Sequence, residues 1–177
     1  MGAHEKTAAR SDQHLPKSKQ TSLGLYVTAL EAYEMWKADP DRIKIIDVRT
    51  PEEYGFIGHP DQAWNIPLAF VTYRRQKGLT IYGPKWNPSF VEEVRTIAGA
   101  TDTLLVMCRS GDRSAMAVNQ LAEAGLKNVY TIIDGFEGDK AKIGPERGHR
   151  AVNGWKNAGL EWGYSISLDQ VYPGDRM

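Results

Sequence analysis

One stretch decides the fold, and it reads LLVMCRSGDRSAMAV from Leu104 to Val118. It begins with a short apolar run of the kind that forms a buried strand, and it ends in a run typical of a helix. Between the two lie Cys108, the single cysteine of the chain, and a turn rich in glycine, serine and arginine. The stretch therefore predicts a strand, a tight loop and a helix, with a thiol at the carboxyl end of the strand.

Short apolar runs alternate with helix-like segments along most of the chain. Strands are expected at 43–48, 63–68, 103–107 and 128–132, and helices at 29–38, 51–56, 88–99, 114–124 and 153–159. This alternation favours an α/β fold in which helices cover both faces of a parallel sheet. Ligands of such sheets bind at the carboxyl ends of the strands, where Cys108 is expected to lie.

The chain is expected to form one domain with a polar extension. Residues 1–23 contain few large apolar side chains, which predicts a disordered or loosely held arm. Residues 24–177 have the length of a single domain. Within it, the segments near 74–88 and 139–152 are rich in glycine, proline and charged residues, and they are expected to be inserted surface loops.

Charge and hydropathy limit the partners of the protein. The 177 residues include 22 lysines and arginines and 22 acidic residues, so nucleic acid and anionic membranes are not expected as partners. No apolar run approaches the roughly 20 residues of a membrane span. The N-terminal segment lacks the apolar centre of a secretory signal, which predicts a cytoplasmic protein. A periplasmic location is the alternative if an export signal has been removed.

A lone cysteine excludes an internal disulfide and a cysteine-based metal cluster, and no metal site is expected. Such a thiol is either a small core residue or a reactive group. Its surroundings favour the second interpretation, because Gly111 permits a tight turn and Arg109 and Arg113 add positive charge. Thiols at helix N-termini beside cations ionise readily. Cys108 is therefore expected to be a nucleophilic thiolate near neutral pH.

The chain resembles a single-domain rhodanese of the thiosulfate sulfurtransferase-like family over about residues 25–163. The resemblance rests on four segments in this order and spacing: IIDVRTPEEY, NIPL, LLVMCRSGDRSAMAVNQLAEAGLKNVYTIIDGFEG and GWKNAGLEW. It implies a rhodanese-like fold, with a central parallel five-stranded sheet flanked by helices on both faces. It also implies sulfur transfer through a covalent cysteine persulfide, without any other cofactor.

The resemblance also implies a role for individual residues. Cys108 would be the nucleophile that carries the sulfur. Asp47 and Arg49, in the sequence DVR, match the N-terminal signature of the family and would brace the catalytic loop by hydrogen bonds. The substrate- and persulfide-binding loop would consist of Arg109, Ser110, Gly111, Asp112, Arg113 and Ser114.

The implied partners are a small-molecule donor such as thiosulfate and a thiophilic acceptor, which could be a protein thiol. A monomer is the default oligomeric state. The sequence departs from the usual C-terminal signature, because sixteen residues separate Gly138 from Trp155 where the family has a short glycine-rich turn. This departure leaves the identity of the acceptor open.

Two other functions remain as alternatives. One is a persulfide-carrying or sulfur-sensing module that delivers sulfur to a protein partner with little turnover. The other is a phosphatase or arsenate reductase, whose loops resemble this one but hold one residue more. Here four residues separate Cys108 from Arg113, and Met107 stands where the phosphatase signature has histidine. The shorter loop suits one sulfur atom better than a tetrahedral phosphate.

Overall fold

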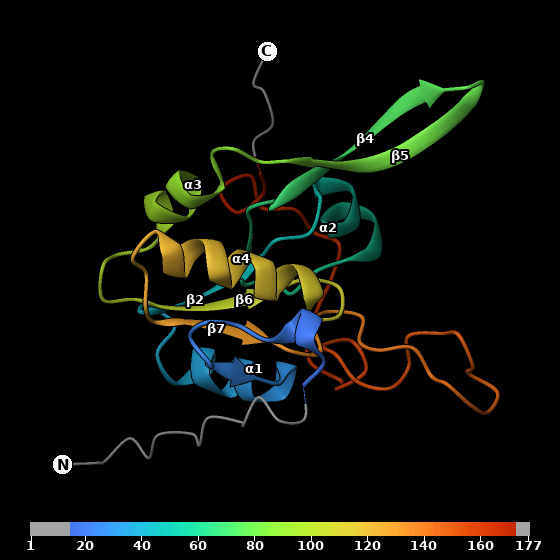
Figure 1. The fold of residues 1–177 in the computed structure, drawn as a ribbon. Coiled ribbons are helices and arrows are strands. Elements are labelled where there is room, and N and C mark those ends of the chain that lie inside the picture. The colour runs from blue at the N-terminus through green and yellow to red at the C-terminus, as the bar shows by residue number, and fades with distance from the viewer. Residues whose placement is uncertain (1–14, 173–177) are drawn as a thin grey trace.

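A five-stranded sheet forms the centre of the computed structural model, which describes residues 15–172 (Figure 1). Its strand order is β1-β7-β6-β2-β3, and all neighbouring strands are parallel. These strands are β1 (Tyr26–Val27), β2 (Ile43–Asp47), β3 (Ala63–Asn65), β6 (Thr103–Met107) and β7 (Val129–Ile132). The expected α/β class and the parallel five-stranded sheet are confirmed.

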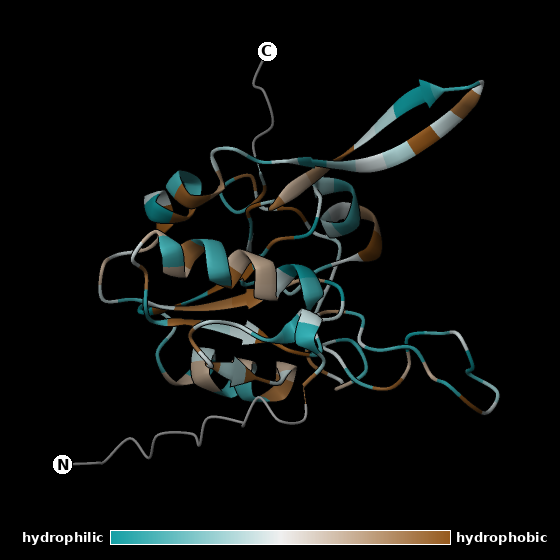
Figure 2. Ribbon diagram, viewed as in Figure 1, coloured by the Kyte–Doolittle hydropathy of each residue, from teal (hydrophilic) through white to brown (hydrophobic). Residues whose placement is uncertain are grey.

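Helices cover both faces of this sheet. They are α1 (Ala29–Ala38), α2 (Pro51–Ile57), α3 (Phe90–Ile97) and α4 (Asp112–Glu123). Apolar residues of α3 and α4 pack with Val106 on one face, and those of α1 pack with Leu105, Tyr54 and Trp155 on the other. Figure 2 shows that hydrophobic residues concentrate in the central strands. Within residues 15–172, no helix is long and apolar enough to span a membrane.

Local sequence signals explain where the helices begin. Thr28 and Thr50 each form a capping box with the glutamate three residues later, at the starts of α1 and α2. Helix α4 differs from the expected range 114–124, because it begins two residues earlier, at Asp112. Gly111 is its N-cap and has a left-handed backbone with φ of 106°. The glycine of the loop thus starts the helix directly, without a side-chain cap.

An antiparallel hairpin occupies the segment that was expected to be a loop near 74–88. Strand β4 (Ala69–Gln76) pairs with β5 (Leu79–Trp86), and the two project away from the central sheet (Figure 1). Lys77 and Gly78 form the two-residue turn and both have positive φ, as a type I′ turn requires. Pro84 is tolerated because a two-stranded ribbon leaves one edge of each strand unpaired.

Two segments near the ends also differ from expectation. The helix predicted at 153–159 is absent, since the chain forms turns there, with positive φ at Gly154 and Gly159. Residues 15–23, assigned to a loose arm, pack against α4. They include a short 3₁₀ helix, η2 (Lys17–Lys19), and a hydrogen bond of 2.8 Å from the N–H of Ser22 to Asn119 Oδ1. The rest of the predicted arm, residues 1–14, lies outside the described residues.

Candidate active site

Cys108 lies where the parallel strands predict a ligand site, immediately after β6 and before α4. Its side chain is buried, with 2% of the residue surface exposed. The backbone N–H of Gly111 donates a hydrogen bond of 3.1 Å to Cys108 Sγ. The hydroxyl of Ser114 lies 3.6 Å from the same sulfur. The start of α4 therefore directs one amide N–H at the sulfur and places one hydroxyl oxygen where it accepts from the thiol, next to the positive end of the helix dipole.

The segment after β7 is hydrogen-bonded to the backbone of the loop that follows Cys108. The N–H of Phe136 donates to the carbonyl oxygen of Cys108 at 2.8 Å, and the N–H groups of Glu137 and Gly138 donate to the carbonyl of Arg109 at 3.0 and 3.1 Å. A side chain on Gly135 would place its Cβ 2.5 Å from the Cys108 carbonyl oxygen. The backbone of the loop and that of residues 135–138 are thus in direct contact.

Gly111 is closely surrounded and has a backbone conformation that residues with a side chain avoid. A Cβ atom added there would collide with the carbonyl oxygen of Ile133 and approach Lys19 Cδ to 3.0 Å. Combined with its positive φ, this contact means that only glycine fits at the position without displacement of the loop. The hydrogen bond from Gly111 to the sulfur depends on that placement.

The predicted loop residues do not all face the thiol. Ser114 is fully buried, and its hydroxyl donates to the Gly111 carbonyl at 3.0 Å and lies 2.9 Å from Thr131 Oγ1. Ser110 is also buried, whereas Arg109 and Asp112 are exposed to solvent. Within residues 15–172, the side chain of Arg109 has no hydrogen-bond or ion-pair partner.

Arg113 was expected to bind an anionic substrate, but its guanidinium is already paired with the carboxylate of Glu53 in α2. Two hydrogen bonds of 2.6 Å join the guanidinium to both carboxylate oxygens. Burial alone would raise the pKa of Glu53, but the bonds and charge of Arg113 outweigh it and lower that pKa. Burial would likewise lower the pKa of Arg113, yet Glu53, and to a smaller degree the charge of Cys108, raise it. Arg113 therefore ties the start of α4 to α2.

Asp47 and Arg49 form a fully buried ion pair beside the loop. Arg49 Nε and Nη2 donate to the Asp47 carboxylate at 2.6 to 3.0 Å, and Nη2 also donates to the Gly58 carbonyl at 2.8 Å. Burial would lower the pKa of Arg49, but the Asp47 charge raises it overall. The expected hydrogen bonds to the catalytic loop are not formed within the described part of the chain. Instead the guanidinium lies 4.3 Å from the ring centre of Phe136.

Sequence reasoning missed three residues that shape the site: Glu53, Thr131 and Phe136. A signal existed for Glu53, because it is the third residue after the N-cap Thr50, which predicts a capping box. Its second partner, Arg113, comes from a distant segment and has no local signal. Thr131 and Phe136 belong to β7 and the turn after it, and only the tertiary fold brings them to the loop.

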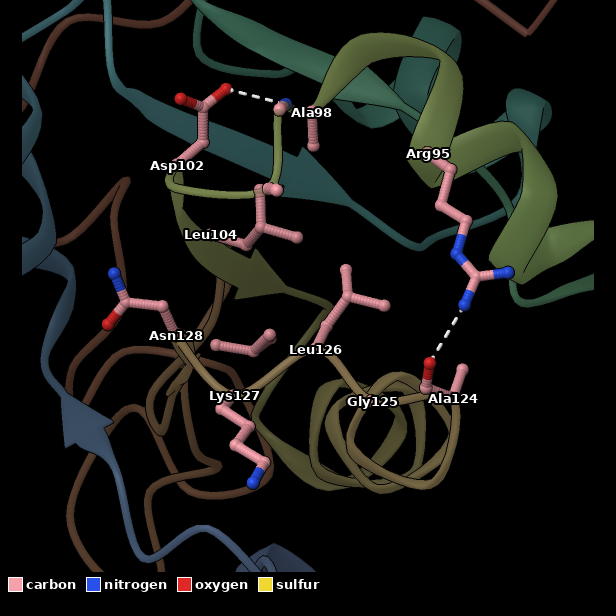
Figure 3. A pocket seen from close by; sticks show the side chains of 12 residues that line it. Arg95, Ala98, Asp102, Leu104, Ala124, Gly125, Leu126, Lys127 and Asn128 are labelled. Atoms are coloured by element: carbon pink, nitrogen blue, oxygen red, sulfur yellow. Dashed lines mark hydrogen bonds between the residues drawn. The ribbon is translucent and has the colours of Figure 1, made fainter.

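One cavity lies close to Cys108, and another pocket lies far from it. A cavity of about 280 Å³ lies beside the loop, between the base of the hairpin, α2 and Arg113. A larger pocket of about 560 Å³, shown in Figure 3, is lined by residues that precede or begin β6 and β7, such as Leu104 and Asn128. There Arg95 donates to the Ala124 carbonyl at 2.8 Å. This pocket lies at the opposite edge of the sheet from Cys108.

Comparison with known proteins agrees with this architecture. The family model described as "Rhodanese-like domain" matches residues 28–142, which is more than half of the chain. The chain belongs to the rhodanese family. This confirms the family resemblance that the motifs carried.

Relatives of this rhodanese include proteins of plants and bacteria. It is 39% identical over 93 residues to the senescence-associated protein DIN1 of Raphanus sativus, and this match spans 52% of the chain and 46% of that protein. It is 37% identical over 93 residues to "Thiosulfate sulfurtransferase 16, chloroplastic" of Arabidopsis thaliana, spanning 52% and 70% of the two chains. The crystal structure of Rv0390 from M. tuberculosis has a TM-score of 0.61 and 32% identity, covering 78% of this chain and 96% of that one. The family is thus one of sulfurtransferases.

Proposed function

We propose that this rhodanese moves a sulfane sulfur from thiosulfate, or a similar donor, to a thiophilic acceptor through a persulfide on Cys108. One observation carries the proposal: the N–H of Gly111 lies 3.1 Å from Cys108 Sγ at the start of α4. The first N–H groups of a helix have no partner inside the helix. These groups and the helix dipole favour an anionic sulfur, both in the thiolate and in the persulfide.

The first half-reaction loads the cysteine. The Cys108 thiolate attacks the outer, sulfane sulfur of thiosulfate and forms a new S–S bond. The S–S bond of thiosulfate breaks, and sulfite leaves with the electron pair. Thiosulfate carries two negative charges, and Arg109 is an exposed cation at the loop that attracts it.

The second half-reaction regenerates the thiolate. An acceptor such as cyanide or a thiol attacks the outer sulfur of the persulfide, and the Cys108 sulfur leaves with the electrons of the S–S bond. The nucleophile of the first step is thus the leaving group of the second, so the cycle requires no general base. The result is covalent, ping-pong catalysis.

Phosphoryl chemistry fits the site less well. A phosphate cradle needs a guanidinium that is free to bind two oxygens of the substrate. Here both terminal nitrogens of Arg113 bind Glu53 at 2.6 Å. The ion pair therefore favours sulfur transfer over the phosphatase and arsenate reductase alternatives.

The proposal is tested by initial-rate kinetics of thiocyanate formation from thiosulfate and cyanide. We expect parallel double-reciprocal lines for the wild-type protein and complete loss of turnover in Cys108→Ser. Met116→Ser changes an exposed sulfur-containing side chain on α4 and serves as the matched control. Turnover that survives in Cys108→Ser would refute the proposal. A single stoichiometric transfer without turnover would instead favour the persulfide-carrier alternative.

A further inference from the structure

We propose that the β4–β5 hairpin docks an acidic protein whose cysteine thiol is the sulfur acceptor. The inference rests on the proposed sulfur transfer and names the partner of the same site. The hairpin projects from the domain on the side where the sheet strands end and α4 begins (Figure 1). Each of its strands has eight residues, which corresponds to a length of about 26 Å.

One face of the hairpin is apolar and exposed. Directly opposed residues of an antiparallel pair project on the same face. Val71 opposes Pro84, and Tyr73 opposes Tyr82, so these four side chains share a face. Val71, Tyr73 and Tyr82 are 53%, 72% and 71% exposed. Aromatic side chains of this kind are typical of the centres of protein interfaces.

The same face leads to the catalytic loop. Val71, Tyr82 and Pro84 line the cavity of about 280 Å³ together with Glu53 and Arg113. Arg113 is two residues beyond Gly111, whose N–H binds the sulfur of Cys108. A polypeptide lying along this face would therefore end beside the loop that holds the persulfide.

The charge of the hairpin indicates the chemistry of the partner. Residues 69–86 contain no acidic side chain, although acidic and cationic residues are equal in number over the whole chain. Of the cations of the hairpin, Arg75 shares the face of Val71 and Tyr73, Lys77 lies in the turn, and Arg74 and Lys85 project on the opposite face. A narrow ribbon with cations on both faces and no acidic side chain attracts an acidic protein.

Two other occupants fit less well. A second copy of the chain would pair the hairpins about a twofold axis and bring like charges together. A membrane would be met first by the tip, where Leu79 is the one large apolar side chain that could insert. The apolar face instead borders the cavity beside Arg113, which favours a protein ligand.

The transfer to this partner balances in the same way as transfer to cyanide. The partner thiolate attacks the outer sulfur of the Cys108 persulfide and forms a new S–S bond. The S–S bond to Cys108 breaks, and its electron pair stays on Cys108 as the thiolate. The partner leaves as a persulfide, and no external oxidant or reductant is consumed.

The test compares acceptors in steady-state kinetics with thiosulfate as donor. Two synthetic peptides of about twelve residues, long enough to follow one strand, carry a single cysteine and either glutamates or lysines. We expect the KM of the acidic peptide to be about tenfold lower than that of the basic one, and the difference to shrink as salt screens it. Cyanide, which is too small to touch the hairpin, is the reference acceptor.

Variants locate the effect on the hairpin. The triple variant Arg74→Gln, Arg75→Gln, Lys77→Gln should raise the KM of the acidic peptide about tenfold and leave cyanide turnover unchanged. In the matched control, three exposed cations at the other edge of the sheet are neutralised instead, and the KM should not change. These substitutions are Lys37→Gln, Arg42→Gln and Lys127→Gln.

The outcomes separate the two proposals. Absence of thiocyanate formation by the wild-type protein would overturn the sulfur-transfer function itself. Normal cyanide turnover with no preference for the acidic peptide, or an equal effect of both triple variants, would overturn only the docking proposal. Binding to phosphatidylglycerol vesicles that is lost in the hairpin variant, with unchanged peptide kinetics, would also overturn it and identify a membrane-binding hairpin.

Discussion

The substitution Gly111→Ala tests the geometry of the loop between Cys108 and α4 most directly. The added methyl group meets two separate obstacles in the structure. The first is the backbone, since φ at this position is 106°. The second is the carbonyl oxygen of Ile133, with which the new Cβ would collide. That carbonyl cannot move freely, because the N–H of the same residue is bound to the Val27 carbonyl at 2.9 Å.

The two obstacles can be given magnitudes. A non-glycine residue held in an unfavourable backbone region costs about 1–3 kcal/mol. Overpacking of a well-filled site adds about 1–3 kcal/mol. We therefore expect Gly111→Ala to lower the free energy of unfolding by about 2–6 kcal/mol. The loop should also move away from Ile133 and weaken the Gly111 hydrogen bond to Cys108, which reduces sulfur transfer.

Two further alanine variants separate these costs in denaturant titrations. Gly125 also has a positive φ, of 92°, but an added Cβ there meets no atom within 4 Å, so Gly125→Ala should lose only about 1–2 kcal/mol. Gly83 has an ordinary φ and open space, and Gly83→Ala should be nearly neutral. If Gly111→Ala were no less stable than Gly125→Ala, and equally active, the tight loop described here would be wrong.

Three other predictions concern the ion pairs around the loop. Glu53→Gln should lower the free energy of unfolding at neutral pH by about 1 kcal/mol, a modest value because the pair with Arg113 is partly exposed. Since the folded state lowers the pKa of Glu53, this stabilisation is present above the unfolded pKa and is lost as pH falls through the folded pKa. Denaturant titrations between about pH 6 and about pH 3 should therefore show the unfolding free energies of the wild-type protein and the variant converging in acid. A difference that stays constant over this range would contradict the assignment. Arg49→Met should cost about 3–5 kcal/mol by leaving the Asp47 charge buried alone, and adding Asp47→Asn should restore part of it; no recovery in the double variant would argue against the pair as the source.

Local patterns were sufficient to predict four of the five strands of the central sheet. The apolar runs that became β2, β6 and β7 are short and flanked by clear helix signals, including the capping boxes at Thr28 and Thr50. These strands and helices could be predicted from local sequence because burial of their apolar residues and capping of the helix ends favour the same structure. Strand β1 has two residues, Tyr26 and Val27, and is too short to produce a pattern of its own.

The hairpin shows why other elements could not be predicted. Gly78, Gly83 and Pro84 read as loop residues, and the turn is Lys-Gly rather than one of the stronger hairpin dipeptides. The prediction for 153–159 was wrong in the opposite sense, because its helix-like composition gave turns. Trp155 is fully buried within these turns. Both errors arise where tertiary packing decides the backbone.

The candidate site was predictable in part. The thiol at a strand end, Gly111 at the turn and the start of α4 all follow from one contiguous stretch. The partners of Arg113 and Arg49 do not, because Glu53 and Phe136 come from segments far away in the sequence. The loop residue Arg113 was therefore expected to bind the substrate, whereas the structure shows it holding two helices together.

The most direct measurement of the central claim is the intact mass of the protein after incubation with thiosulfate and removal of excess donor. We predict that the wild-type chain gains the mass of one sulfur atom, that cyanide removes it, and that Cys108→Ser gains nothing. An unchanged wild-type mass, or a sulfur adduct that persists in Cys108→Ser, would contradict the assignment of Cys108 as the sulfur carrier.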